Sequence, residues 1–154
     1  LAERLRGTYK MLHLPDGLSQ DSLHMLMTCE PQIKEIGDLI SRTDVLLFGI
    51  GTAMRMADQR HIADDVRKKL VDNHAVGEAL GQYCDMDGKL IYSTNNIGLS
   101  LPDVAKVPNV IAVAGGQEKA SAIIGVMRAC QKGILIIDEQ AAEGMRQLLQ
   151  ISAL

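Results

Sequence analysis

The stretch from Asn109 to Met127, NVIAVAGGQEKASAIIGVM, constrains the fold more than any other part of the chain. It begins with a short, apolar, β-branched run at 110–113, which is typical of a strand covered on both faces in a parallel sheet. Gly115 and Gly116 interrupt this strand, and the residues after them have the pattern of an amphipathic helix. The stretch therefore predicts a strand, a tight turn and a helix, which is a building unit of α/β folds.

Lys119 lies in the first turn of this predicted helix. The unpaired N–H groups and the dipole at that end favour an anion, and glycines allow backbone amides to approach a ligand closely. A cation there opposes the dipole, so its position is explained if a phosphate or carboxylate neutralises it. An ordinary turn with a solvated lysine explains the residues equally well, and the sequence GGQEKA is not a nucleotide P-loop.

Length and composition indicate one globular domain with a single core. The chain has 154 residues, 47% of them apolar and 23% charged, with one Phe and no Trp, so aliphatic and thioether side chains must fill the interior. The net charge of −3 gives no general attraction for nucleic acid, and no apolar run is long enough to span a membrane. Three scattered cysteines indicate reduced, buried thiols and a cytoplasmic location. The first residues, LAERLRG, look like a helix end without a starting Met, which indicates a piece of a longer protein.

Strands and helices are predicted to alternate over most of the chain. The predicted strands cover 8–14, 44–48, 110–113 and 133–137, with a β-hairpin on either side of Asp87-Gly88 and a turn at 15–17. The predicted helices cover 20–28, 31–40, 53–58, 62–73, 102–106 and 140–150. This order predicts an α/β fold with a mainly parallel, Rossmann-like sheet and helices on both faces. Such sheets bind ligands at the carboxyl ends of their strands.

A second glycine turn, Gly49-Ile50-Gly51, follows the strand predicted over 44–48. This turn does not match the NAD-binding motif, because the third glycine position of that motif holds Met54. The amides of residues 49–53 could instead bind a small anion, and a purely structural tight turn is an equal alternative.

Two charged residues beyond this turn are candidates for ligand binding. Arg60 ends the following helix and could bind a phosphate with its guanidinium. An arginine at this position more often serves only as a cation that stabilises the C-terminal end of its helix. Glu78 lies in an otherwise apolar run, so it could accept hydrogen bonds from sugar hydroxyls, act as a base, or simply face water. Asp138 is best explained as a helix cap. No catalytic triad and no metal-binding spacing of Cys or His is present.

Four ordered segments carry a resemblance to a known family: GIGTAMRMADQR, NHAVGEALGQYCDMDGKLI, IGLSLPDVAKVPNVIAVAGGQEKASAI and ILIIDEQAAEGM. Together they closely resemble the sugar-binding domain of SorC-type bacterial transcription regulators, over nearly all of the chain from Gly7 onward. The resemblance implies a fold related to ribose-5-phosphate isomerase and glucosamine-6-phosphate deaminase. It also implies a phosphorylated sugar as the effector, which for members that control glycolytic genes would be fructose 1,6-bisphosphate. The resemblance further implies that the protein forms a homo-dimer or homo-tetramer and needs no cofactor. It also implies that an upstream helix-turn-helix binds the operator DNA.

By motif position, the resemblance also implies a set of effector-site residues. They are Gly49, Gly51 and Thr52 in one loop, Arg60 after the loop helix, Glu78 as the sugar-contacting acid, and Gly115, Gly116 and Lys119 as the phosphate turn. Gln59 and Arg60 match the family's arginine position equally well. The family domain normally begins with an earlier strand, a Gly-Gly-Thr loop and a helix that contribute to the site, and none of these precedes Leu1. The domain over residues 1–154 is therefore expected to lack part of its pocket as well as the DNA-binding segment.

Two other functions compete with an effector-sensing module. An isomerase or deaminase would use Glu78 as a base beside Lys119, but no second acid/base residue is set by spacing. A pure dimerisation domain would pair through the apolar final helix. The sensing module, which needs no catalytic residue, is the function that the sequence favours.

Overall fold

The computed structural model describes residues 2–14 and 17–150 and confirms the α/β class that the sequence predicts. Its strands are β1 (Val45–Gly49), β2 (Gly51–Thr52), β3 (Gly77–Ala79), β4 (Gln82–Cys84), β5 (Leu90–Ser93), β6 (Asn109–Ala114) and β7 (Ile134–Ile137). Its helices are α1 (Gln20–Cys29), α2 (Pro31–Ser41), α3 (Ala53–Gln59), α4 (Asp64–Asp72), α5 (Ala120–Cys130) and α6 (Glu139–Leu148). Its 3₁₀ turns are η1 (Glu3–Leu5), η2 (Pro102–Lys106) and η3 (Gln117–Lys119).

The predicted helices, the β4–β5 hairpin and the three strands of the parallel sheet form where the hydrophobic pattern indicated them. The strand predicted over 8–14 is wrong, because this described segment joins no sheet. Two of its apolar residues, Tyr9 and Met11, are 68% and 60% exposed, so neither has a strand edge or a core to pack against. Residues 15 and 16 of the predicted turn lie outside the described residues.

The strands form two sheets that are joined at the Gly49–Gly51 turn. β1, β6 and β7 make a parallel sheet in that order, with Leu46 beside Val110. β2, β3, β4 and β5 make an antiparallel sheet, so less of the molecule is parallel than the sequence predicted. The chain leaves the first sheet at Gly49 and enters the second at Gly51, with Ile50 buried between them. The glycines of this turn therefore allow one chain segment to change sheets within three residues.

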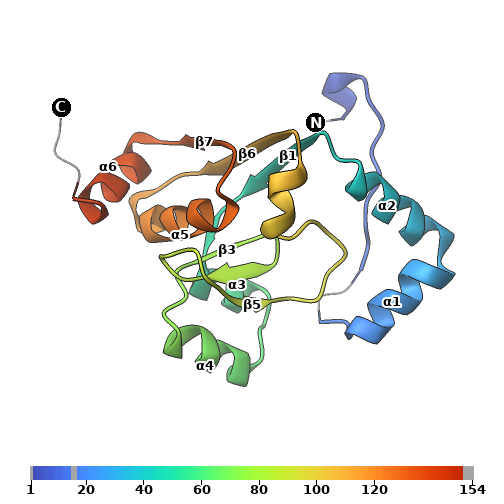
Figure 1. Ribbon diagram of the computed structural model, residues 1–154, viewed down its shortest axis with the longest axis horizontal. Coiled ribbons are helices and arrows are strands. Elements are labelled where there is room, and N and C mark those ends of the chain that lie inside the picture. The colour runs from blue at the N-terminus through green and yellow to red at the C-terminus, as the bar shows by residue number, and fades with distance from the viewer. Residues whose placement is uncertain (1, 15–16, 151–154) are drawn as a thin grey trace.

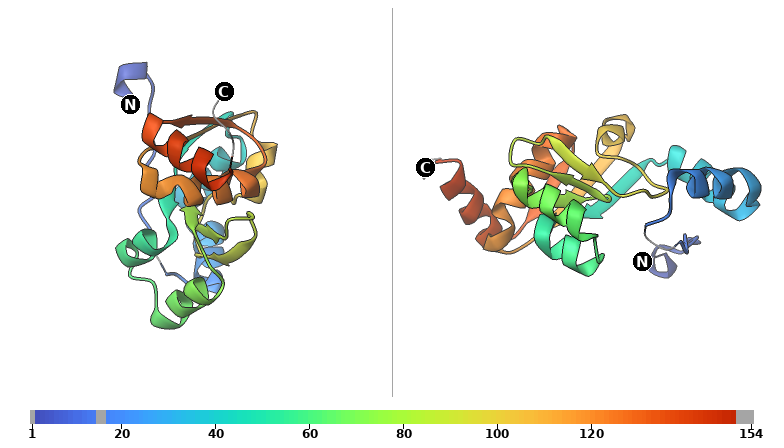
Figure 2. Two further views of the ribbon diagram at one scale, coloured as in Figure 1. Left: turned by 90° about the vertical axis from the view of Figure 1, so that its left-hand side faces the viewer. Right: turned by 90° about the horizontal axis from the view of Figure 1, so that it is seen from below.

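Helix α5 is the centre of the core. It lies between the two sheets and is buried along most of its length, while α6 packs beside it (Figures 1 and 2). The main cluster joins its residues Ala122, Ile123 and Val126 to the inner faces of β1, β6 and β7. A second cluster around Leu70 and Tyr83 fixes α3 and α4 to the antiparallel sheet. The order of layers is thus parallel sheet, α5, antiparallel sheet, and the pair α3 and α4.

One face of the parallel sheet is open among the described residues, which corrects the expectation of helices on both faces. Its apolar side chains are 41% to 63% exposed: Val45, Leu47, Val113, Ile134 and Ile136. The cause is the strand order, which grows in one direction from β1 to β7. Right-handed crossovers that all run in one direction place every connecting helix on the same face, and a reversal of strand order is needed to cover the other.

Helices α1 and α2 form a pair that stands apart from this core (Figure 1). Ser19 caps α1 by accepting a hydrogen bond from the Ser22 N–H, and Pro31 begins α2. Leu23 is the buried residue of α1, and the described residues of α2 include none that is buried. No helix within residues 2–14 and 17–150 has the length and apolarity to cross a membrane.

Candidate functional site

A cavity of about 480 Å³ lies where β1 and β6 end. This is the carboxyl edge of the parallel sheet, where α/β folds place their ligands. Six of the eight residues that the sequence predicted for a binding site line it: Gly49, Gly51, Thr52, Arg60, Glu78 and Lys119. The segments that carry them are far apart in the chain and meet because β1 and β6 are adjacent parallel strands.

Glu78 is a buried carboxylate in the wall of this cavity. It lies in the middle of β3, opposite Gly51 of β2, and is only 3% exposed. Its Oε1 accepts a hydrogen bond of 2.7 Å from the N–H of Gly81. Leu80 and Gly81 have φ angles of 55° and 78°, the pattern of a type I′ turn in a two-residue hairpin. The Glu78 carboxylate therefore stabilises the Leu80-Gly81 turn, in which leucine takes the left-handed backbone conformation that bulky residues rarely adopt.

Arg60 pairs with this carboxylate. Its Nη2 lies 3.3 Å from Glu78 Oε1, and its side chain is about a quarter exposed, at 26%. A buried carboxylate needs such a partner, because an isolated charge is costly away from water. The positive charge of Arg60 is thus largely balanced within the protein. Gln59, the alternative for the same role, also lines the cavity.

Lys119 and Thr52 bring a cation and a hydroxyl to the cavity. Lys119 is the N-cap residue of α5 and is partly buried, at the end of the η3 turn. Thr52 occupies the N-cap position of α3, but its side chain makes no capping hydrogen bond. Its hydroxyl is therefore available to a ligand that enters the cavity.

Gly115 and Gly116 lie beside the cavity without lining it. The N–H of Gly116 donates to both carboxylate oxygens of Asp138, at 3.1 and 2.9 Å, so this amide is not available to a ligand while Asp138 stays in place. Asp138 also caps α6, as predicted, by accepting from the Ala141 N–H at 2.8 Å. The N–H groups of Ala141 and Gly116 and the charge of Lys119 lower the pKa of Asp138. The two glycines give Asp138 room, because a Cβ on Gly115 would lie 2.7 Å from its Oδ2.

Sequence reasoning missed two charged residues of the cavity, Arg55 and Glu118. Arg55 is exposed and lies in the first turn of α3. The signal that singled out Lys119, a cation just after a glycine turn, was also present for Arg55. Glu118 folds over the other turn, since its carboxylate oxygens lie 2.5 and 2.6 Å from the place where Gly116 would carry a Cβ.

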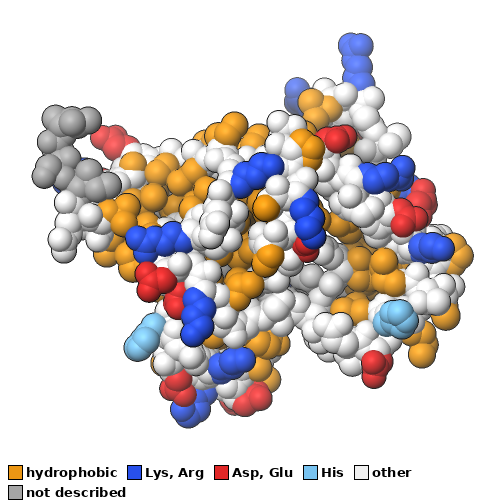
Figure 3. Space-filling view, viewed as in Figure 1, with side chains coloured by type: hydrophobic (Ala, Val, Ile, Leu, Met, Phe, Trp, Pro, Cys, Tyr) orange, Lys and Arg blue, Asp and Glu red, His pale blue; other side chains and the backbone are white. Residues whose placement is uncertain are grey.

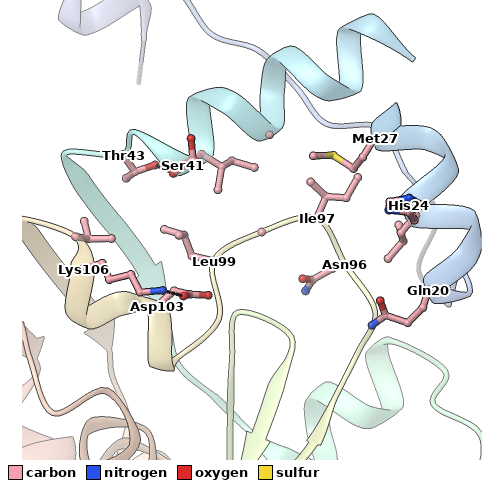
Figure 4. Close-up of a pocket in the computed structure, with 15 residues that line it drawn as sticks. Gln20, His24, Met27, Ser41, Thr43, Asn96, Ile97, Leu99, Asp103 and Lys106 are labelled. Atoms are coloured by element: carbon pink, nitrogen blue, oxygen red, sulfur yellow. Dashed lines mark hydrogen bonds and ion pairs between the residues drawn. The ribbon is translucent and has the colours of Figure 1, made fainter. Parts of the chain in front are cut away.

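A larger cavity of about 640 Å³ lies between the α1–α2 pair and the segment at 96–107. Hydrophobic side chains line the hollow there (Figure 3), and the close-up shows Met27, Ile97 and Leu99 along it (Figure 4). Lys106 donates to Asp103 at 2.6 Å; this bond and one from Ser100 lower the pKa of Asp103 to about 2. The cation of this cavity is already paired, so the smaller cavity is the better candidate for an anionic ligand.

Comparison with known proteins identifies relatives of this chain. A family model described as "Putative sugar-binding domain" matches residues 1–147. The chain is 38% identical over 143 residues to the central glycolytic genes regulator of Bacillus subtilis (strain 168). This match covers 93% of this chain and 42% of that protein. It is 37% identical, with a TM-score of 0.84, to the solved "putative SorC family transcriptional regulator" from Enterococcus faecalis, covering 94% of this chain and 58% of that one.

The full-length sorbitol operon regulator SorC from Klebsiella pneumoniae has the same fold, with a TM-score of 0.76 at 23% identity. That match covers 94% of this chain and 47% of the other. The chain thus spans less than half the length of the curated regulators that it matches.

Proposed function

Since the chain belongs to the sugar-binding domain family of SorC-type transcriptional regulators, we propose that it senses a phosphorylated sugar. The observation that carries the proposal is the cavity at the ends of β1 and β6, which is lined by six of the eight residues predicted for the effector site. Lys119 would bind the phosphate, Thr52 would bind a hydroxyl or phosphate oxygen, and Glu78 would contact the sugar beside Arg60. Fructose 1,6-bisphosphate is the effector that we propose, because the Bacillus subtilis relative is named a regulator of glycolytic genes.

In this proposal Gly115 and Gly116 shape the turn that positions Lys119. The Gly116 amide is engaged by Asp138, so the lysine side chain supplies the main attraction for the phosphate. Gly49 and Gly51 similarly leave the mouth of the cavity free of side chains. A Cβ on Gly51 would also lie 2.4 Å from Cγ of Met56, so glycine is required for the local packing.

The effector would act by shifting a conformational or oligomeric equilibrium of a longer repressor that binds operator DNA through another segment. A ligand shifts such an equilibrium only by its difference in affinity for the two states. We propose a homo-dimer or homo-tetramer in the cytoplasm, with no cofactor. The chain's net charge of −3 supports the view that DNA is contacted elsewhere.

The enzyme alternative is less well supported. Glu78 Oε1 already accepts hydrogen bonds from the Gly81 N–H and from Arg60, so these contacts favour a carboxylate that stays a hydrogen-bond acceptor over one that takes up a substrate proton. The relatives named above are transcriptional regulators. Nuclear magnetic resonance of the protein with fructose 6-phosphate, ribose 5-phosphate or glucosamine 6-phosphate would reveal isomerisation or deamination, and turnover of any of them would refute a pure sensor.

Isothermal titration calorimetry tests the sensing function directly. Fructose 1,6-bisphosphate and fructose 6-phosphate should bind the chain, and Lys119→Ala should lose about 1.5 to 3 kcal/mol of binding free energy. Lys69→Ala is the matched control, since Lys69 is an exposed lysine on α4 that does not line the cavity. A dissociation constant that Lys119→Ala leaves unchanged would contradict the proposal, as would the absence of binding by this chain and by an upstream-extended chain.

A further inference from the structure

The cations that line the cavity differ in how the described residues balance their charges. Its charged residues are Arg55, Arg60, Glu78, Glu118 and Lys119. Arg60 is paired with Glu78, as its 3.3 Å contact shows. Lys119 is close enough to Asp138 to help lower the pKa of that carboxyl group. Among the described residues, no hydrogen bond or ion pair is formed by Arg55.

The nearest acid on the same helix does not compensate Arg55. Asp58 lies one turn further along α3, where the two side chains could meet. Asp58 instead forms an ion pair with Arg67 of α4. Arg55 is therefore an exposed cation that lines the cavity and is not paired with the acid nearest to it on α3.

We infer that Arg55 binds a second anionic group of the ligand and so determines the specificity of this site. The inference rests on the proposed function and extends it to a residue outside the predicted set. Arg55 follows β2 and Lys119 follows β6, so the two cations come from separate segments that converge on one cavity. A planar guanidinium binds phosphate or carboxylate through two parallel hydrogen bonds, whereas a lysine acts as a point charge. The class of ligand is a sugar derivative with two anionic groups.

Calorimetry with Arg55→Ala and Arg55→Lys tests this role. Fructose 1,6-bisphosphate, fructose 6-phosphate and inorganic phosphate are the probes, and Arg42→Ala is the control with the same change of charge, because Arg42 is exposed and lines neither cavity. Arg55→Ala should lower the affinity for the bisphosphate by about 10-fold to 100-fold and the affinity for fructose 6-phosphate by less than about 3-fold. Arg55→Lys should restore only part of the lost affinity, since lysine cannot form the paired contact.

The dependence on salt provides a second readout. Loss of a phosphate-binding cation should make bisphosphate affinity less sensitive to ionic strength, and Arg42→Ala should leave that sensitivity unchanged. An equal loss for the bisphosphate and monophosphate, or no loss for either, would overturn the role of Arg55 while leaving phosphosugar sensing intact. Failure of the parent chain to bind any of the sugars would overturn both.

Discussion

Replacing Glu78 with alanine separates a structural role of this carboxylate from a ligand-binding one. The substitution removes the acceptor of the buried Gly81 N–H and leaves Arg60, only 26% exposed, without its anionic partner. An unsatisfied buried donor costs about 1–3 kcal/mol, and breaking a fully buried ion pair costs about 3–5 kcal/mol. Since Arg60 is partly open to water, we expect the free energy of unfolding to fall by about 3 kcal/mol in total.

Urea unfolding followed by circular dichroism measures this loss, and two further variants locate its origin. Glu78→Gln keeps an oxygen for the Gly81 N–H, so it should lose about 1–2 kcal/mol. In an Arg60→Met background, Glu78→Ala should cost about 1–2 kcal/mol less than in the parent, because no guanidinium at position 60 then loses its anionic partner. A loss below about 1 kcal/mol for Glu78→Ala in the parent would refute the structural role. Glu78 would then serve the ligand alone.

Three other predictions address the core, the thiols and the Gly115-Gly116 turn. Gly125→Ala should lower the free energy of unfolding by about 1–3 kcal/mol, because a Cβ there would lie 2.3 Å from the carbonyl oxygen of Asp85; unchanged urea midpoints would contradict this. Burial raises the pKa of Cys84 to about 12, helped by nearby Asp85, and that of Cys130 to about 11. A thiol reagent at mildly alkaline pH should therefore modify only the exposed Cys29 before unfolding, and rapid reaction of a second thiol would be the contrary result. Because the Ala141 and Gly116 N–H groups lower the pKa of Asp138, its stabilisation is complete above the unfolded pKa of about 3.9 and disappears as the pH falls through the lower folded value. Melting temperatures measured by circular dichroism across that acid range should fall less steeply for Asp138→Asn than for the parent.

Local sequence pattern predicted the elements whose stability depends on their own residues. The run at 110–113 and the spacing of apolar residues after Gly116 were sufficient to predict β6 and α5. The segment at 8–14 has a similar apolar character but no neighbouring strand, and pairing is a property of the whole fold. Buried thiols were predicted for all three cysteines, and exposed Cys29 at the end of α1 corrects this for one of them.

The candidate site was predictable to the extent that glycine turns and isolated charges mark it. Gly49, Gly51 and Lys119 come soon after the ends of two predicted strands in the sequence, and in the structure they line one cavity. The pairing of Arg60 with Glu78 depends on contacts between residues 18 positions apart, which a sequence pattern does not specify. The hairpin turn at Leu80-Gly81 was also missed, because leucine rarely takes a positive φ and gave no turn signal.

The open aliphatic face of the parallel sheet affects how this chain can be studied in solution. Fluorescent dyes that brighten on apolar surfaces should bind the native protein at Leu47, Ile134 and their neighbours, and so give a strong signal before any unfolding. Intrinsic emission is a weak substitute, since the chain has three Tyr and no Trp. Far-ultraviolet circular dichroism reports the backbone of α5 and the other helices, so we expect it to distinguish folded from unfolded molecules of this protein.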